Sequence, residues 1–232
     1  MGIAQAGIAF RISDSVKDVA SFLGDVFQEH AAETPLPVSE RFDIRNHSDV
    51  MMQTFGDVCF ISNDDLAWPL IRRPEADAAR LHAALGKPEK ILAFCHYDAS
   101  GSHGYALFEN GVRRRTRLQT HNTPDAPKLV ESGAPLAFEQ RWLNALQTET
   151  AGSGGAVAYL GEQEVVVPAR ELTGRMLQDG LESLFGICPW ETLLTPTYRF
   201  FRLGHERARV DEPAVSRAKQ IDAIKRPWWQ FL

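Results

Sequence analysis

The side chains best suited to chemistry gather around one predicted β-hairpin. Residues 95–98 (Cys-His-Tyr-Asp) end one predicted strand, and residues 103–105 (His-Gly-Tyr) begin the next. The adjacent Cys95 and His96 suggest a thiolate–imidazole pair, as in cysteine enzymes. Successive side chains of a strand point to opposite faces, so these two cannot meet in a regular strand. We therefore reject that pair.

The same alternation gathers a different group. If Asp98 pairs with His103 across the turn, then His96 faces Tyr105, and all four side chains share one face near the loop. Two imidazoles, a carboxylate and a phenol could perform acid–base catalysis or hold a divalent metal. The alternative is a half-exposed polar face, which antiparallel sheets commonly have. The same register pairs Phe94 with Leu107 and Leu92 with Glu109 across the two strands. The opposite face is apolar and carries Ile91, Ala93, Cys95, Tyr97, Ala106 and Phe108.

A basic run follows the Asn110-Gly111 turn. Arg113, Arg115 and Arg117 share one face of the predicted strand 112–119. A solvated sheet face explains them most simply, and binding of an anion or an acidic partner is the functional alternative. Arg114 would point toward the apolar side and would need a carboxylate there.

The C-terminal tail is the other unusual feature. Residues 211–225 are charged and could form a helix, which Pro227 would end. Trp228, Trp229 and Phe231 then place three aromatic rings near the terminus. Exposed, they would form an apolar patch that needs a partner, either a second copy of the chain or another protein. The alternative is that the tail folds back onto its own domain.

Other candidates for catalysis are weak. Asp64 and Asp65 follow a predicted strand, where adjacent acids are typical of turns and caps, and Glu109 is explained by the turn it precedes. The chain has no GxSxG elbow, Walker loop, GxGxxG, HExxH or EF-hand pattern. Residues 152–155 are glycine-rich but lack the lysine of a phosphate loop. We assign no cofactor and no metal from the sequence, and whether the protein is an enzyme stays open.

Composition narrows the class of protein. The chain has 232 residues, 44% of them hydrophobic and 24% charged, which suits a globular fold with a sizeable core. Its net charge of −5 is unfavourable for binding a phosphate backbone, so we expect no nucleic acid partner. The three cysteines form no CxxC pair and fit buried thiols of a reducing compartment. With no signal peptide and no apolar run of the ~18–20 residues of a membrane span, we expect a cytoplasmic protein.

Turn residues and apolar periodicity predict the secondary structure. A surface loop is expected over 30–40, an irregular segment over 66–71 because of Pro69, and a loop over 120–136. Helices are predicted over 15–27, 73–85, 138–146 and 172–185, and strands over 7–12, 50–62 (two), 90–98, 103–109, 112–119, 156–167 and 198–203.

This order predicts an α+β fold with a largely antiparallel sheet and helices packed on one face. We also consider a ferredoxin-like arrangement for the N-terminal half. One compact domain is expected over 1–204, with a possible subdomain boundary near 120–136 and the tail 205–232 beyond it. The sequence favours a non-catalytic binding or protein-interaction module of the bacterial cytoplasm. The alternative is a hydrolase-like or metal-binding enzyme that uses the hairpin residues His96, Asp98, His103 and Tyr105.

Overall fold

The computed structural model describes residues 4–12, 19–35, 42–73, 75–76, 78–120, 129–149, 157–160 and 166–204. Its strands are β1 (Ala4–Arg11), β2 (His30–Thr34), β3 (Asp49–Phe55), β4 (Val58–Ser62), β5 (Lys90–Tyr97), β6 (Ser102–Glu109), β7 (Val112–Gln119), β8 (Leu129–Ser132), β9 (Leu146–Glu149), β10 (Val157–Leu160), β11 (Val166–Pro168) and β12 (Thr197–Gly204). Its helices are α1 (Val19–Phe27), α2 (Asp64–Arg72), α3 (Ala79–Ala84), α4 (Ala137–Leu143) and α5 (Leu172–Phe185), with a 3₁₀ turn at Ala169–Glu171.

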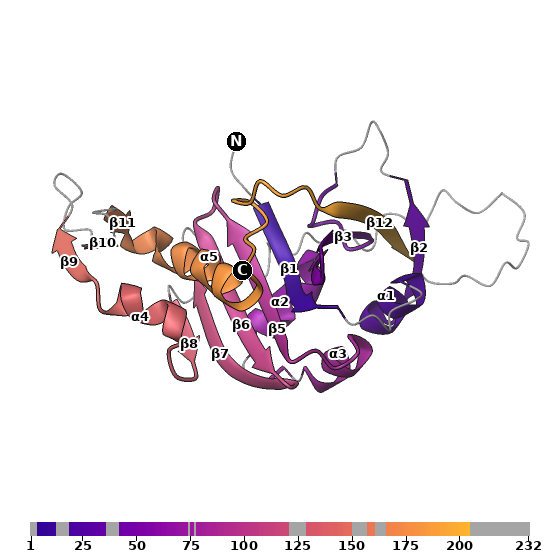
Figure 1. Cartoon of the computed structure of the whole chain (residues 1–232), viewed down its shortest axis with the longest axis horizontal. Coiled ribbons are helices and arrows are strands. Elements are labelled where there is room, and N and C mark those ends of the chain that lie inside the picture. The colour runs from indigo at the N-terminus through magenta and orange to yellow at the C-terminus, as the bar shows by residue number, and fades with distance from the viewer. Residues whose placement is uncertain are drawn as a thin grey trace, which may run out of the picture.

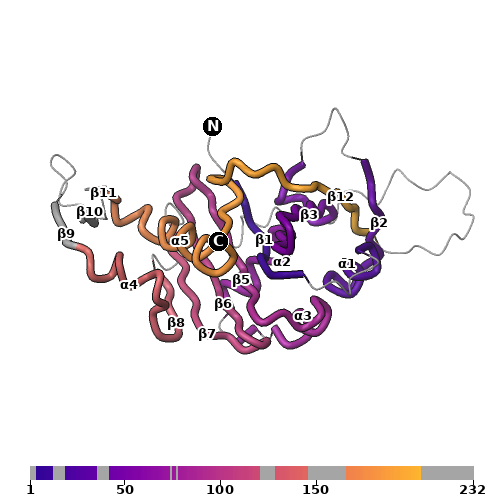
Figure 2. The backbone as a smooth tube through the Cα atoms, in the orientation of Figure 1, coloured from indigo at the N-terminus to yellow at the C-terminus, as the bar shows by residue number. Residues whose placement is uncertain are grey.

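Nine of these strands form one antiparallel sheet in the order β2-β12-β3-β4-β1-β5-β6-β7-β8. The late strand β12 inserts between the early strands β2 and β3, which Figure 2 shows as an orange segment among indigo ones. A small sheet, β11-β10-β9, lies at the end of the molecule beyond α4 (Figure 1). The predicted α+β fold with a large antiparallel sheet is thereby confirmed.

Helices cover both faces of the large sheet, so the expectation of helices on one face is wrong. One core packs α1, α2 and α3 against a face that includes Ile8, Ile91 and Phe108. The other packs α4 and α5 against the opposite face, which includes Phe94 and Leu107. The physical reason is the composition of β1 and β5, which are apolar at successive positions and therefore bury both faces. Figure 1 shows α4 and α5 at one end of the sheet and α1 and α3 at the other.

The predicted turns are found where the sequence places them. β6 and β7 meet at Asn110-Gly111, where both residues have positive φ (51° and 78°), as an Asn-Gly hairpin turn requires. Gly186 ends α5 with φ 77°, the left-handed conformation typical of a glycine after a helix. The strands predicted over 50–62, 90–98, 103–109, 112–119 and 198–203 are confirmed.

Several elements differ from the prediction. The segment around Pro69 is helix α2 rather than irregular chain, because its Ala67, Leu70 and Ile71 are buried and Asn63 caps it by accepting a bond from the Leu66 amide at 3.0 Å. β2 and β8, expected to be loops, are short strands at the two edges of the sheet. The predicted helix 73–85 is shorter, at Ala79–Ala84, and β9 begins at Leu146, where a helix was expected. Within the described residues, no helix is long and apolar enough to cross a membrane.

Candidate functional site

The hairpin of β5 and β6 brings two histidines directly opposite each other. His96 pairs with His103, Phe94 pairs with Tyr105, and Tyr97 with Ser102 is the last pair before the loop. The expected pairing of Asp98 with His103 is wrong by two residues, because the loop begins at Asp98 and turns through Gly101, whose φ is 63°. A slip of two keeps each side chain on its predicted face, since the alternation has a period of two. The group predicted from the sequence therefore still gathers, apart from Tyr105.

Three of the predicted side chains converge at this end of the hairpin. The Nδ1 atoms of His96 and His103 lie 3.2 Å apart, and the two ring centroids 4.6 Å apart. The Nε2 atom of His96 lies 2.9 Å from Oδ1 of Asp98. One ligand atom from each of the three residues lies within 4.8 Å of the other two. This is the one group of three or more His, Cys, Asp or Glu side chains with such spacing in the described part of the chain.

Neighbouring elements fix the two imidazoles. The indole of Trp190, in the loop after α5, stacks on the His96 ring with centroids 4.8 Å apart and planes at 17°. α5 lies against His103 at Gly174, where a Cβ atom would come within 3.2 Å of ring atoms Cγ and Nδ1. A glycine at this point of the helix therefore lets α5 approach the imidazole closely. His103 is buried and His96 is half-buried, so neither ring has much freedom to turn.

Burial favours the neutral form of His96. Desolvation lowers the pKa of His96 below its usual value, and the carboxylate of Asp98 opposes this shift. The nearby cation Arg175 lowers the pKa further, whereas Glu191 raises it. A neutral imidazole is the form that can ligate a metal or accept a proton. With Nε2–H donated to Asp98, the lone pair of His96 lies at Nδ1, toward His103.

A polar cavity of about 750 Å³ opens beside the pair of histidines. The hairpin loop, the start of α5 and the loop after α5 form its walls. His96, His103, Gly174 and Trp190 line it. Its other polar lining is Asp98, Ser100, Arg170, Glu171, Arg175, Gln178 and Glu191. Because most of these polar residues are exposed, a solute can reach the histidines from solvent.

Tyr105 lies outside the group. Its side chain is fully buried in the core between the sheet and helices α4 and α5, where its ring packs edge-on against Phe138 with centroids 5.8 Å apart. Burial and the carboxylate of Glu139 raise the pKa of Tyr105 well above its usual value. Tyr105 faces Phe94, two pairs further from the loop than His103, and it does not line the cavity. The phenol predicted for catalysis is thus a core side chain.

The arginines of β7 are divided between the two sheet faces. A bulge opposite Leu107 and Phe108 leaves Arg114 without a partner residue on β6, so Arg113 and Arg115 point to opposite faces. Arg113 lies over the Phe108 ring at 4.8 Å, and Arg114 binds Glu109 at the surface. The expectation of three arginines on one solvated face is therefore wrong. Arg114 was expected to pair with a carboxylate on the apolar side, but its partner Glu109 lies at the surface.

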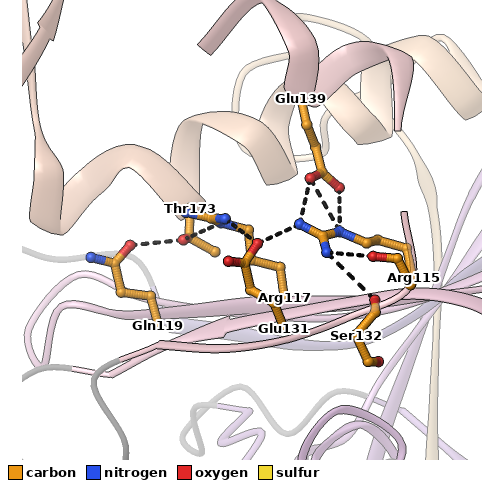
Figure 3. Close-up of polar contacts among 8 residues, drawn as sticks. Arg115, Arg117, Gln119, Glu131, Ser132, Glu139 and Thr173 are labelled. Atoms are coloured by element: carbon orange, nitrogen blue, oxygen red, sulfur yellow. Dashed lines mark hydrogen bonds and ion pairs between the residues drawn. The ribbon is translucent and has the colours of Figure 1, made fainter. Parts of the chain in front are cut away.

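Arg115 and Arg117 are buried in an internal ion-pair network (Figure 3). Arg115 binds both carboxylate oxygens of Glu139 through Nε and Nη2, at 2.7–3.1 Å. It shares Glu131 with Arg117, each at 2.5 Å. Arg117 also donates through Nε to the Thr173 hydroxyl at 3.0 Å, which joins β7 to the first turn of α5. These charges are balanced internally, so the hypothesis that they bind an anion loses its support.

The remaining candidates lie away from the cavity. Asp64 is buried at the start of α2 and accepts a bond from the Tyr97 hydroxyl at 2.5 Å, on the opposite sheet face from His96. Burial raises the pKa of Asp64 to about 6, although the bond from Tyr97 opposes this. Asp65 lies 2.6 Å from Nδ1 of His47. Burial raises the pKa of Cys95, so this thiol is not a nucleophile at neutral pH. Trp228, Trp229, Phe231 and the rest of the tail 205–232 lie outside the described residues.

Sequence reasoning found the hairpin half of the site and missed the half contributed by α5 and the following loop. Arg170, Arg175, Gln178 and Glu191 carry no motif that marks them. Gly174 within an otherwise regular amphipathic helix was the available signal of a close approach. Comparison of the chain with protein-family models, with curated proteins and with solved structures gave no match.

Proposed function

We propose that the protein is a hydrolase-like enzyme that binds a divalent cation through His96, His103 and Asp98. The observation that carries the proposal is the convergence of these three side chains on the wall of an open polar cavity. Two imidazoles and a carboxylate suit Zn²⁺, Mn²⁺, Fe²⁺ or Co²⁺ and leave coordination positions for water or substrate. A cation held this way lowers the pKa of a bound water, which makes the water a nucleophile at neutral pH.

The spacing of the histidines supports the proposal. Two nitrogens bonded to one tetrahedral zinc at ~2.0–2.1 Å lie roughly 3.3 Å apart, and the two Nδ1 atoms lie 3.2 Å apart. Asp98 starts from the Nε2 side of His96 and belongs to the exposed loop, so it can rotate toward the cation or keep orienting His96 from outside. In the outside position Asp98 accepts a bond from Nε2–H, which favours the His96 tautomer whose Nδ1 is unprotonated.

Titration with Co²⁺ tests the site, because the visible spectrum of Co²⁺ reports nitrogen ligation and coordination number. Calorimetry with Zn²⁺ gives the affinity. We expect one ion per chain, and a loss of affinity of at least about tenfold in His96→Asn. His47→Asn is the matched control, because His47 contacts the carboxylates of Asp65 and Glu29 but does not belong to the group of three candidate ligands. Equal affinity in the wild type and His96→Asn would overturn the proposal.

Hydrolytic activity is tested separately. The metal-loaded protein is assayed on chromogenic esters of phosphate and of carboxylic acids, with a chelator-treated sample as the reference. We expect turnover that is lost with the chelator, restored by the cation and absent in His96→Asn. Turnover that survives both the chelator and the substitution would show that the histidine pair is not the catalytic centre.

The interaction-module hypothesis keeps the absence of familiar catalytic motifs and the aromatic tail as its basis. Its other support was the arginine strand, whose Arg115 and Arg117 bind carboxylates of the same chain. We also propose a cytoplasmic location, which is supported by the three buried thiols. A ferredoxin-like N-terminal half is proposed on the strand order β3-β4-β1-β5, all antiparallel, with α1 and α2 on one face.

A further inference from the structure

The lining of the cavity includes an arginine that forms no ion pair with a described acidic side chain. Arg175 follows Gly174 on α5 and is exposed at the cavity. Nη1 of Arg175 donates a long hydrogen bond to Oε1 of Gln178, at 3.3 Å. Arg170, the other arginine of the cavity, pairs with Glu171 at 3.5 Å. Among the described residues that line the cavity, Arg175 is the cation without an ion pair.

Arg175 lies at the same cavity as the candidate metal site. It lines this cavity together with His96 and His103, and the residue before it on α5, Gly174, lies against the His103 ring. A guanidinium presents a planar fork of N–H donors that matches the oxygens of a phosphate or carboxylate group. Gln178, one turn of helix further on, also lines the cavity and supplies an amide N–H and an oxygen.

The charges of the cavity lining favour a negatively charged ligand once a cation is bound. The pair Arg170–Glu171 cancels, which leaves Arg175 against the carboxylates of Asp98 and Glu191. A divalent cation reverses this balance from −1 to +1, because it adds two positive charges. The pocket then attracts an oxyanion, with the cation on the hairpin side and the guanidinium on the helix side.

We propose that the substrate carries a phosphate-type group, bound between the cation and Arg175. The inference rests on the proposed metal site and names the class of substrate for it. The cation binds one oxygen of the group, and Arg175 donates two N–H bonds to others. Gln178 holds the guanidinium toward the cavity until the ligand replaces its long bond. A phosphate ester is favoured over a carboxylate, since its additional oxygens can bridge both positive centres at once.

Binding of inorganic phosphate to the Co²⁺-loaded protein, measured by calorimetry, tests the inference. The variants are Arg175→Gln and, as the matched control, Arg170→Gln on the turn that precedes α5. We expect Arg175→Gln to weaken phosphate binding about tenfold or more, as the loss of charge-assisted bonds does, and to leave Co²⁺ binding unchanged. Arg170→Gln should change phosphate binding less than threefold.

The outcomes separate this inference from the proposed metal site. Phosphate affinity that is equal in Arg175→Gln and the wild type, with Co²⁺ bound normally, overturns the inference and leaves the metal site standing. Absence of Co²⁺ binding in the wild type overturns the metal site. In that case the metal-free protein is titrated with phosphate, and binding that is weakened by Arg175→Gln supports the role of the arginine by itself. A parallel titration with acetate tests the ligand class, and acetate binding more tightly than phosphate overturns the phosphate assignment.

Discussion

The buried ion-pair network at the base of α4 gives the most quantitative prediction. Glu139 is fully buried and receives three N–H···O contacts from Arg115, at 2.7–3.1 Å. Glu139→Gln keeps the shape of the side chain but removes its charge and turns one acceptor oxygen into an N–H₂ donor. That donor faces the Arg115 guanidinium, so at least one bond is lost and the buried arginines outnumber their carboxylates.

Two independent estimates of the cost agree. Removing one partner of a buried ion pair destabilises a protein by about 3–5 kcal/mol. Hydrogen bonds to charged groups contribute about 1.5–3 kcal/mol each, and the substitution removes or weakens two of them. We expect the free energy of unfolding to fall by about 3–4 kcal/mol. In a chain of this size, this corresponds to a decrease in Tm of roughly 10 °C.

Urea unfolding followed by far-UV circular dichroism measures the change. The matched control is Arg114→Ala, the next residue along β7, whose pair with Glu109 lies at the surface. It should cost at most about 1 kcal/mol. A Glu139→Gln variant as stable as this control would refute the conclusion that the buried pair of Arg115 and Glu139 contributes more to stability than a surface pair. Replacing both partners, in R115M/E139L, leaves Arg117 balanced by Glu131 and should cost less than Glu139→Gln alone.

Three further predictions concern single positions. Gly174→Ala gains about 0.5–1 kcal/mol of helix propensity, but its methyl group would press on the His103 ring and should therefore weaken Co²⁺ binding. Gly180→Ala, on the same helix, should leave Co²⁺ binding intact. Equal Co²⁺ binding in both variants would contradict the tight contact at residue 174. His47→Gln should lower the free energy of unfolding by less than about 1 kcal/mol at pH 6 and by less still at pH 9. Hydrogen bonding to Asp65 raises the pKa of His47, and the stability that this gives is lost as the pH rises through the folded pKa. An effect in urea unfolding that does not depend on pH would refute this. Gly7→Ala should lower the midpoint of thermal unfolding severely, since its Cβ would lie 2.1 Å from the backbone oxygen of Ile61 on the neighbouring strand β4. A midpoint near that of the wild type would show that β1 and β4 can separate there.

The central meander and the hairpin half of the site could be predicted because they depend on local rules. Asn110-Gly111 fixes one turn, and the alternation of β5 and β6 places His96 and His103 on one face for any register shifted by two residues. The face assigned to solvent is nevertheless covered by α5. An isolated sequence does not reveal which helix will cover which face, because that depends on contacts between Gly174 and His103, more than sixty residues apart.

Arg114 and Pro69 show two other limits of sequence reasoning. A bulge at Arg114 reverses the direction of every side chain that follows in β7, which moves Arg115 and Arg117 from the predicted surface into the core. No residue type marks that bulge in advance. Pro69 argues against a helix by its missing N–H, yet the burial of Leu70 and Ile71 outweighs one lost hydrogen bond. Tertiary packing decided both cases.

The first turn of α5 explains how the buried network and the cavity are connected. Consecutive residues of a helix point about 100° apart, since one turn takes 3.6 residues. Thr173 therefore faces β7, where its hydroxyl accepts from Arg117 and donates to Gln119 at 2.7 Å. Gly174 faces His103, and Arg175 faces the cavity. A rotation of α5 by one residue would break all three contacts at once, so the network that anchors Thr173 also sets the distance between Arg175 and the histidines.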